Sequence, residues 1–400
     1  MSRMELPAVH VWDGRDDLGV RRLEWSLDDV DGTVDQLAPV AADAEFSVVP
    51  GLIDTHVHLI GNASSTPADF LAWPLVTRTE EQVLHGLSHA RRALAAGVTT
   101  LRDLAADDVQ FSLKRALDAG VVEGPRLLAH GVVNMTGGHA DLFIPPAVAQ
   151  RKPVADGPDA CRALVRHWAR AGSDGIKVPV SGGVLSDGDK AAWRNYTEAE
   201  IAAIVDEAHA FGMPVAAHAH TEAGIRAALR HGVDSIEHAT QLTPELAAEV
   251  VAAGIAVAPT LLINDRIARG GGTISAAQQA KAAGLVAQRD GWFRAAADAG
   301  VEFVLGTDAN GHHVVFGDQM EEVRQMAAVF GWTASRALEA ATSRAAHVIG
   351  RPDLGVVGAG APADFLVMRG QPWRDIDQLR TENIVAVVSR GRVVAGNLPA

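Results

Sequence analysis

From residue 45 onward, short apolar runs alternate with alanine-rich stretches in which apolar residues recur at helical spacing. The apolar runs are rich in valine and isoleucine, as the buried strands of parallel sheets are. This alternation is typical of repeated βαβ units. The expected strands cover residues 48–59, 99–104, 126–131, 175–180, 215–220, 235–240, 256–261 and 303–308. Their number is the one that closes a (β/α)8 barrel.

Capping residues mark the ends of the expected helices. Thr197 and Glu200 have the capping-box spacing at the start of TEAEIAAIVDEAHAFG, and Gly212 follows the last helical position. The segments HARRALAAG and EAGIRAALRHG also end on a glycine. These helices therefore begin and end between expected strands, as the helices of a barrel do.

The two ends of the chain have a different pattern. Residues 1–45 alternate polar and apolar positions without helical periodicity, and residues 355–400 contain strand-like runs separated by glycines. We expect residues 1–48 and 355–400 to form one small β-sandwich domain beside a barrel of residues 49–354. The predicted fold class is α/β, a TIM barrel with a small β domain built from both termini.

Composition and charge exclude several classes of protein. The 400 residues are 48% hydrophobic and 21% charged, close to the average of globular proteins. The formal net charge of -14 disfavours binding to nucleic acid or to an anionic membrane surface. No apolar run reaches the ~18 residues of a membrane span, the N-terminus lacks a signal-peptide core, and the single cysteine, Cys161, excludes an internal disulfide. We expect a cytoplasmic homo-oligomer whose partner is a small-molecule substrate.

The strongest local signal for chemistry is the pair His56 and His58 in GLIDTHVHL. On a strand, residues two apart point to the same side. At the carboxyl end of a barrel strand that side faces the barrel mouth, where two neutral imidazoles can bind one divalent metal ion. Chance placement in a chain with 16 histidines is the alternative, and the flanking PGLID motif weighs against it.

Lys177 lies among apolar residues in DGIKVPV, on an expected interior strand. Lysine is almost never buried without a partner, and burial lowers its pKa. A neutral lysine amine can react with CO2 to give a carbamate whose two oxygens bridge two metal ions. The alternative is a lysine whose stem packs on the barrel while its amine reaches solvent or an acidic side chain. Together with the histidines, the carbamate is the favoured interpretation.

His218 and His220 repeat the two-residue spacing in VAAHAH, and His238 follows Glu237 in SIEHAT. The 20 residues between His218 and His238 leave room for one helix between neighbouring strands, so we expect these two histidines to be neighbours in space. His220 is either a substrate contact or a core histidine. Glu237 precedes its histidine by one residue and is therefore expected to face the helices in a structural role.

Asp308 closes FVLGTDAN at the end of the last expected strand. A carboxylate there can bind one metal ion and accept a proton from a water whose pKa two metals lower from 15.7 toward about 7. An aspartate that caps the following turn is the alternative. With the histidines in place, the general base is the favoured role.

Nine motifs in this order resemble the amidohydrolase superfamily: PGLIDTHVH, GVTTLRD, TGGHAD, DGIKVPVSGGV, VAAHAH, GVDSIEHAT, APTL, GTD and GAPADFLV. More narrowly, the chain resembles the branch of lysine-carboxylated, two-metal dipeptidases and amidases, which includes prolidase-like, Xaa-Arg carboxypeptidase-like and ochratoxin-amidase-like enzymes. The resemblance covers roughly residues 45–370. It implies two divalent ions, with zinc as the usual metal.

The resemblance also implies a role for each motif residue. One ion would be held by His56, His58 and Asp308 and the other by His218 and His238, with Lys177 as N6-carboxylysine between them. His139, in TGGHAD, would contact the substrate carbonyl and stabilise the tetrahedral intermediate, although by sequence alone it is a polar residue in a glycine-rich loop.

The expected reaction is hydrolysis of an amide bond in a small substrate, such as a dipeptide or an N-acyl amino acid. A hydroxide activated by two metals would attack the carbonyl, and Asp308 would carry the proton to the leaving nitrogen. Arg266 and Arg269 in INDRIARGGGT either pair with a substrate carboxylate or are ordinary loop arginines. Neither spacing nor strand placement gives His312 and His313 a role.

Two other readings compete with this one. A mononuclear deaminase or an imidazolonepropionase-like hydrolase of cyclic amides uses one metal without a lysine carbamate, so Lys177 argues against it. A catalytically silent barrel scaffold should have lost ligands, whereas all six candidate positions carry competent residues. Lactone or carbamate hydrolysis by the same site stays open, because specificity resides in the loops of residues 61–80, 263–275 and 310–319.

Overall fold

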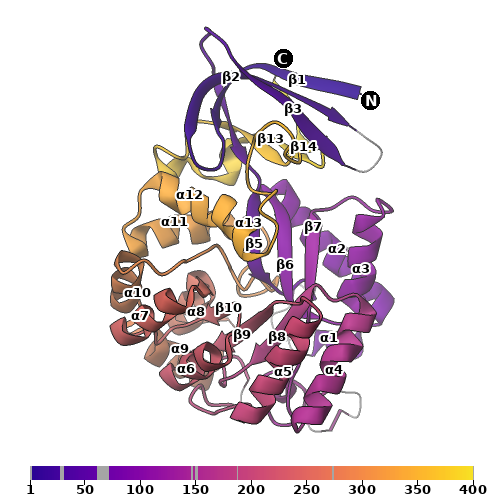
Figure 1. Cartoon of the computed structure of the whole chain (residues 1–400), viewed down its shortest axis with the longest axis vertical. Helices are drawn as coiled ribbons and strands as arrows, with labels where there is room; N and C mark the ends of the chain where they lie inside the picture. The colour runs from indigo at the N-terminus through magenta and orange to yellow at the C-terminus, as the bar shows by residue number, and fades with distance from the viewer. Residues whose placement is uncertain are drawn as a thin grey trace.

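The computed structural model describes residues 2–27, 31–60, 72–145, 147–148, 152–186, 188–272 and 274–399. It consists of a barrel enclosed by helices and a smaller β-sheet at one end of the barrel (Figure 1). The barrel sheet contains seven parallel strands in sequence order. They are β5 (Leu52–Val57), β6 (Val98–Ala106), β7 (Arg126–Val132), β8 (Gly175–Pro179), β9 (Val215–Ala219), β10 (Ser235–His238) and β11 (Ala256–Ala258).

Residues 302–309 fill the eighth position of the barrel. The amide of Val257, in β11, donates to the Glu302 carbonyl on one side, and the amide of Thr55, in β5, donates to the Leu305 carbonyl on the other, each at 2.9 Å. Isolated parallel bridges continue this pairing toward both neighbours. The barrel is therefore closed, which confirms the predicted fold class. The expected last strand forms these bridges rather than a regular strand.

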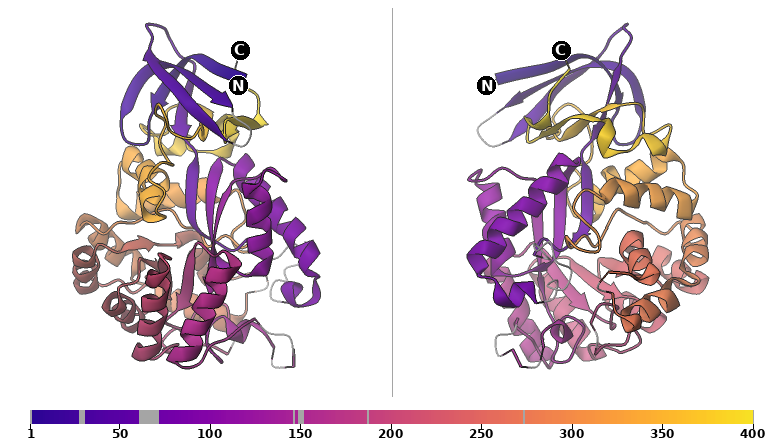
Figure 2. Two further views of the ribbon diagram at one scale, coloured as in Figure 1. Left: turned by 45° about the vertical axis from the view of Figure 1, so that its right-hand side comes forward. Right: turned by 180° about the vertical axis from the view of Figure 1, so that it is seen from behind.

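Helices cover the outside of the barrel (Figure 2). They include α5, which starts with the expected capping box: the Thr197 side chain accepts from the Glu200 amide and the Glu200 carboxylate accepts from the Thr197 amide. The described helices are α1 (Trp73–Val76), α2 (Thr79–Ala95), α3 (Asp108–Asp118), α4 (Pro158–Ala171), α5 (Glu198–Ala210), α6 (Glu222–His231), α7 (Pro244–Ala253), α8 (Leu261–Arg269), α9 (Ala276–Val286), α10 (Arg289–Asp298), α11 (Gln319–Phe330), α12 (Ala334–Ala341) and α13 (Ser343–Val348). Short 3-10 turns cover Asp141–Phe143, Ile376–Gln378 and Thr381–Asn383.

The two chain ends form one mixed sheet in the order β14-β13-β12-β4-β1-β2-β3. Its strands are β1 (Ser2–Trp12), β2 (Asp17–Leu27), β3 (Gly32–Pro39), β4 (Phe46–Pro50), β12 (Phe365–Arg369), β13 (Ile384–Ser389) and β14 (Arg392–Gly396). The strands from the two chain ends share a hydrophobic core. In this core the Trp25 indole packs edge-on to Phe365 at 5.1 Å and donates to the Gly391 carbonyl. Both termini therefore build the small β domain, as predicted.

The terminal sheet is continuous with the first barrel strand. β4 pairs with β1 and with β12, and after Gly51 the chain enters β5 directly. The expected domain boundary at residue 48 thus falls inside β4. The amino end of β5 therefore lies beside the terminal sheet. Because the other barrel strands are parallel to β5, their amino ends also face this sheet, and their carboxyl ends open on the opposite side of the molecule.

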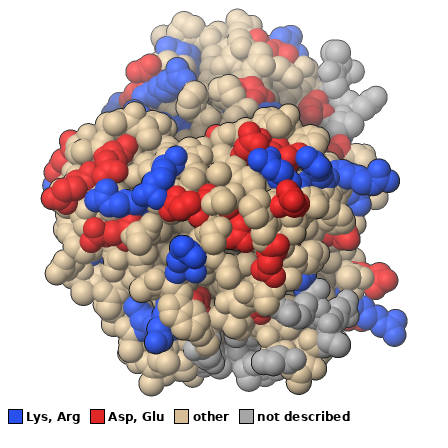
Figure 3. Space-filling model, turned by 60° about the horizontal axis from the view of Figure 1, so that its bottom comes forward, with Lys and Arg blue, Asp and Glu red and all other residues tan. Residues whose placement is uncertain are grey.

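The surface charge and the character of the helices indicate which partners are disfavoured. On the face drawn in Figure 3, Lys and Arg side chains are interspersed with Asp and Glu, so the described residues there lack the one-sided basic stripe of a nucleic-acid-binding surface. Within the described ranges, no helix combines the length and the apolar character that crossing a bilayer requires.

Candidate metal centre and active site

His56, His58 and Asp308 meet at the carboxyl end of β5. The two imidazole rings are 5.2 Å apart at an interplanar angle of 87°. One carboxylate oxygen of Asp308, Oδ1, lies 2.9 Å from His58 Nε2 and 3.6 Å from His56 Nε2. Asp308 directly follows the segment that closes the barrel, and its φ of 57° places a non-glycine residue in the left-handed region. Such a backbone costs about 1–3 kcal/mol and is found most often at functional sites.

His218, His220 and His238 form a second group beside the first. The ring centroids of His218 and His238 are 4.6 Å apart, so the expected neighbours on β9 and β10 do meet. His220 stacks on His238 at 4.5 Å and 13°. One ring nitrogen from each of the three lies within 4.8 Å of the others, and the same holds for His56, His238 and the Asp308 carboxylate. His238 belongs to both groups, so the two candidate ion sites are adjacent.

Hydrogen bonds decide which nitrogen each ring offers to a ligand. His218 Nε2 lies 3.2 Å from the Gly182 carbonyl, which leaves Nδ1. His238 Nδ1 lies 2.7 Å from the Thr260 hydroxyl, which leaves Nε2. His220 Nδ1 lies 3.1 Å from the Thr240 hydroxyl and likewise leaves Nε2. Hydrogen bonding of one imidazole nitrogen while the other faces a metal is the usual arrangement in metalloproteins.

The imidazoles of His56, His218, His220 and His238 are neutral, as metal ligands must be. Burial lowers the pKa of His56 to about 4 and that of His220 to about 3, and it lowers the pKa of His218 and His238 well below the ordinary value. Nearby positive groups, including Lys177, add to this effect. The donor set of neutral imidazoles and one carboxylate suits a divalent ion.

Lys177 projects from β8 into the same space. Its residue is 5% exposed, and Nζ has no hydrogen-bond partner within the described part of the chain. Burial lowers the pKa of the amine to about 8, against the opposing attraction of Glu237 and Asp308. A buried amine without a partner is costly unless something else satisfies it. The orphaned Nζ therefore fits a group that is added to it, such as a metal-binding carbamate.

Glu237 lies inside the barrel, which corrects the expectation that it faces the helices. It is fully buried, and its carboxylate accepts from the Arg102 guanidinium at 3.0 Å and from the Ser235 hydroxyl at 2.6 Å. Its other oxygen is 2.9 Å from His56 Nδ1. Although burial opposes ionisation, the neighbouring Arg102 and His56 hold the pKa of Glu237 well below its usual range. Glu237 thus contacts the Nδ1 side of His56 and leaves Nε2 directed at the candidate metal centre.

His139 stands over the histidine cluster. Its ring stacks on that of His218 at 4.4 Å and 21°, and its Nδ1 lies 2.9 Å from a carboxylate oxygen of Asp189. The sequence reasoning missed Asp189 and Arg102. For Asp189 the only signal in the sequence is its place in SGGVLSDGD, the segment that follows the Lys177 strand.

Arg266 and Arg269 lie together on α8 but differ in their partners. The Arg266 guanidinium donates to the His313 carbonyl at 3.0 Å and pairs with Asp318 at 2.5 Å and with Glu321 at 2.9 Å. Arg269 is exposed, donates to the backbone of its own helix and forms no ion pair among the described residues. Arg266 is thus engaged in holding the following loop, whereas Arg269 retains donors for a ligand.

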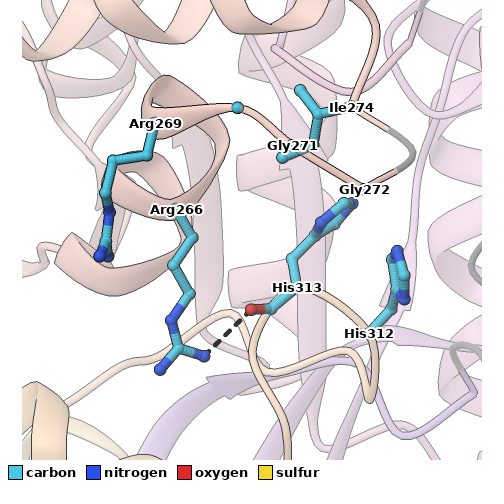
Figure 4. A pocket seen from close by; sticks show the side chains of 8 residues that line it. Arg266, Arg269, Gly271, Gly272, Ile274, His312 and His313 are labelled. Carbon is cyan, nitrogen blue, oxygen red and sulfur yellow. Dashed lines mark hydrogen bonds between the residues drawn. The ribbon is translucent and has the colours of Figure 1, made fainter.

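The same arginines line a pocket of about 360 Å³ (Figure 4). Its other walls are Gly270, Gly271, Gly272, Ile274, His312 and His313. In Figure 4 the two histidines stand side by side, and Arg269 lies further from them than Arg266 does. The pocket combines two of the loops expected to set specificity. Of the third, residues 61–80, positions 61–71 lie outside the described residues.

A closed (β/α)8 barrel with a cluster of histidines and a carboxylate at its strand ends defines a class, the barrel hydrolases that use divalent metal ions. The model of the Amidohydrolase family matches residues 47–394, and the chain belongs to that family. It is therefore an enzyme, a hydrolase that acts on carbon–nitrogen bonds. This confirms the resemblance found in the motifs.

Three known proteins illustrate the relationship. Ochratoxinase of Aspergillus niger is 30% identical over 365 residues, which are 86% of this chain and 74% of that protein. A crystal structure of a Xaa-Pro dipeptidase with bound methionine in the active site is similar with a TM-score of 0.86 and 30% identity, over 98% of this chain and 99% of that one. Imidazolonepropionase of Deinococcus radiodurans is 26% identical over 86% of this chain and 82% of its own.

Proposed function

We propose that the chain is a two-metal amidase that cleaves an amide bond in a small substrate, such as a dipeptide or an N-acyl amino acid. One observation carries the two-metal part of this proposal: the Lys177 amine is buried without a hydrogen-bond partner beside two adjacent groups of metal-binding side chains. The similarity to an ochratoxinase and to a Xaa-Pro dipeptidase supports amide hydrolysis.

The ligand set of the proposal divides between the two groups. His56, His58 and Asp308 would hold one divalent ion, and His218 and His238 would hold the other. Lys177 would be carboxylated: its neutral amine would add to CO2 and lose a proton, and the resulting carbamate would join the ligands of the two ions. We take zinc as the metal, since imidazole and carboxylate ligands suit it.

The bound ions would polarise the substrate carbonyl and acidify a water molecule. Asp308 is ionised at neutral pH, because the imidazoles of His56 and His58 hold its pKa at about 2 although burial opposes ionisation. Its carboxylate would accept the proton of the attacking water and deliver it to the leaving nitrogen. The carbon–nitrogen bond would break, which leaves the hydroxyl group of water on the acyl carbon and its other hydrogen on the amine.

His139 would donate a hydrogen bond to the carbonyl oxygen as negative charge develops there. Its Nδ1 already bonds to Asp189, so donation from Nε2 requires a proton on both nitrogens. His220, which stacks on His238, and the pocket lined by Arg266 and Arg269 would contact the rest of the substrate, with Arg269 as the free partner for a carboxylate.

A one-metal hydrolase of cyclic amides is the competing function, favoured by the similarity to an imidazolonepropionase. It makes no use of a carbamate at Lys177, whereas the orphaned amine fits one. A homo-oligomeric state and a cytoplasmic location also stay predictions of the sequence, which sedimentation and cell fractionation would test.

Metal content per chain tests the proposal directly. We expect about two zinc ions per chain by mass spectrometry of the purified enzyme, and loss of metal together with amide hydrolysis in Lys177→Ala. Lys114→Ala is the matched control, because the Lys114 amine is already paired with Asp118 at 2.8 Å on α3. It should keep both the metal and the activity.

A second measurement detects the carbamate itself. Enzyme prepared with 13C-bicarbonate should show a carbamate signal by 13C NMR that Lys177→Ala lacks and Lys114→Ala retains. One metal ion retained in Lys177→Ala, with no carbamate signal in the wild type, would overturn the two-metal reading in favour of the one-metal enzyme. A wild type that binds two metals but hydrolyses no dipeptide or N-acyl amino acid would reject the proposed substrate class alone.

A further inference from the structure

Asp189 is a buried carboxylate in the loop between β8 and α5 that contacts none of the proposed metal ligands. Its side chain is 1% exposed. One oxygen, Oδ2, lies 2.9 Å from His139 Nδ1 and accepts from the Gly183 amide at 2.7 Å and the Ser186 hydroxyl at 2.9 Å. The carboxylate is thus fixed by its own loop and directed at a single partner outside that loop, the His139 ring.

The remaining surfaces of the His139 ring are also in contact. One face stacks on His218 at 4.4 Å. On Gly183 a Cβ would lie only 2.0 Å from the ring atom Cε1, so the ring rests against bare backbone there. Phe143 meets the ring edge-on at 4.9 Å. With Nδ1 bonded to Asp189, Nε2 is the only nitrogen left for a substrate.

Helix α9 anchors the loop that carries Asp189. The Lys281 amine donates to the Ser186 carbonyl at 2.6 Å, and the Gln278 amide donates to the Leu185 carbonyl at the same distance. These bonds hold the loop from the neighbouring side of the barrel mouth. The position of the Asp189 carboxylate is therefore set by two separate elements of the fold.

We propose that Asp189 is a positioning residue, which holds the Nδ1 proton of His139 and thereby directs Nε2 at the substrate carbonyl oxygen. The proposal rests on the proposed role of His139. A hydrogen bond from Nδ1 to a fixed carboxylate sets the orientation of an imidazole ring and thereby the direction in which its other nitrogen points. Loss of such a supporting partner at metal sites lowers activity by about 10–100-fold, and we expect the same range here.

A double-mutant cycle tests whether Asp189 acts through His139. Asp189→Ala should lower kcat about 10–100-fold with little change in KM, and it should cause no further loss in a His139→Ala background. Asp189→Asn should recover part of the rate, because its carbonyl oxygen can still accept from Nδ1. Additive losses in the double variant would overturn the proposal, since they would mean that Asp189 only stabilises its loop.

Two controls separate positioning from damage to the fold. Asp156→Ala removes another aspartate that anchors the His139 loop, through Thr136 at 3.0 and 2.8 Å, without touching the ring. It should change kcat less than Asp189→Ala does. Metal content should stay at the wild-type level in Asp189→Ala. Loss of metal would also overturn the proposal, because the effect would then pass through Gly182 to His218.

A spectroscopic readout needs no substrate. In 15N-histidine-labelled enzyme, the His139 signal can be assigned by its loss in His139→Ala. It should show that Nδ1 carries a proton in the wild type and that the fraction of rings with this proton is smaller in Asp189→Ala. A His139 ring protonated only on Nε2 would overturn the positioning role. An enzyme with the expected Nδ1 proton but without activity on amides would instead reject the proposed function and leave the Asp189 bond established.

Discussion

Replacing Glu237 by glutamine should destabilise the enzyme and weaken its metal centre at the same time. Arg102 is 2% exposed, and Glu237 carries the negative charge closest to its guanidinium, 3.0 Å away. Removal of one charge from a buried ion pair leaves the other uncompensated and costs about 3–5 kcal/mol. Glutamine keeps the volume and one acceptor for Arg102, so we expect the lower end of this range.

The same substitution places an amide NH2 group opposite His56 Nδ1. Two donors cannot face each other, so the proton of His56 should move to Nε2, the nitrogen on the side of Asp308. His56 would then have no lone pair for a metal ion. Loss of a supporting partner of this kind typically lowers metal affinity about 10–100-fold.

Urea unfolding of the metal-free protein, followed by tryptophan fluorescence, measures the first effect, and zinc titration of the same protein measures the second. Glu198→Gln is the control, because Glu198 forms only surface pairs with Arg230 and His231 and should cost less than about 1 kcal/mol. If Glu237→Gln unfolds with the free energy of this control and binds zinc like the wild type, the supporting role of Glu237 is refuted.

Three further predictions concern Lys177, Gly183 and Arg269. Because the pKa of Lys177 is lowered to about 8, the fraction of neutral amine grows as pH rises through 8, so reconstitution of the metal-free enzyme with zinc and bicarbonate should speed up between pH 7 and 9. Between pH 8 and about 10.5 only the unfolded chain binds this proton, so the metal-free protein should also gain stability with pH there, a gain that Lys177→Met abolishes. Gly183→Ala should displace the His139 ring and lower kcat with metal retained, whereas Gly188→Ala, whose Cβ would meet only one atom at 3.9 Å, should have no effect in the same steady-state assay. Arg269→Ala should raise KM about 2–5-fold for a substrate with a free carboxylate and leave KM unchanged for its carboxamide analogue, because an exposed ion pair contributes up to about 1 kcal/mol.

Local periodicity was sufficient to predict the barrel and the placement of most of the candidate residues. His56 and His58 lie on the same side because β5 is regular up to Val57. The same alternation failed at Glu237, which shares the barrel interior with the residue after it. The cause is the backbone of His238, whose φ of 71° leaves the strand conformation and turns its ring toward the mouth.

The supporting residues were beyond the reach of sequence periodicity. Asp189 reaches His139 across 50 residues from an irregular loop, so no repeat in the sequence joins them. Arg102 and Glu237 are separated by 135 residues and meet only because the barrel closes. The sequence left Arg266 as either a substrate contact or a loop arginine, because its carboxylate partners lie more than 50 residues away, on the other side of the 310–316 loop.

The continuity of β4 with β5 determines the order in which the strands can pair while the chain is being synthesised. β4 lies between β1 and β12, so its second edge stays open until residues 365–369 have been synthesised. The strand that bears His56 is joined to this unfinished sheet by Gly51 alone. β5 is thus made early, whereas the sheet it continues from is completed only after β12 has been made, and a chain that stops short of β12 would present an unpaired strand edge to its neighbours.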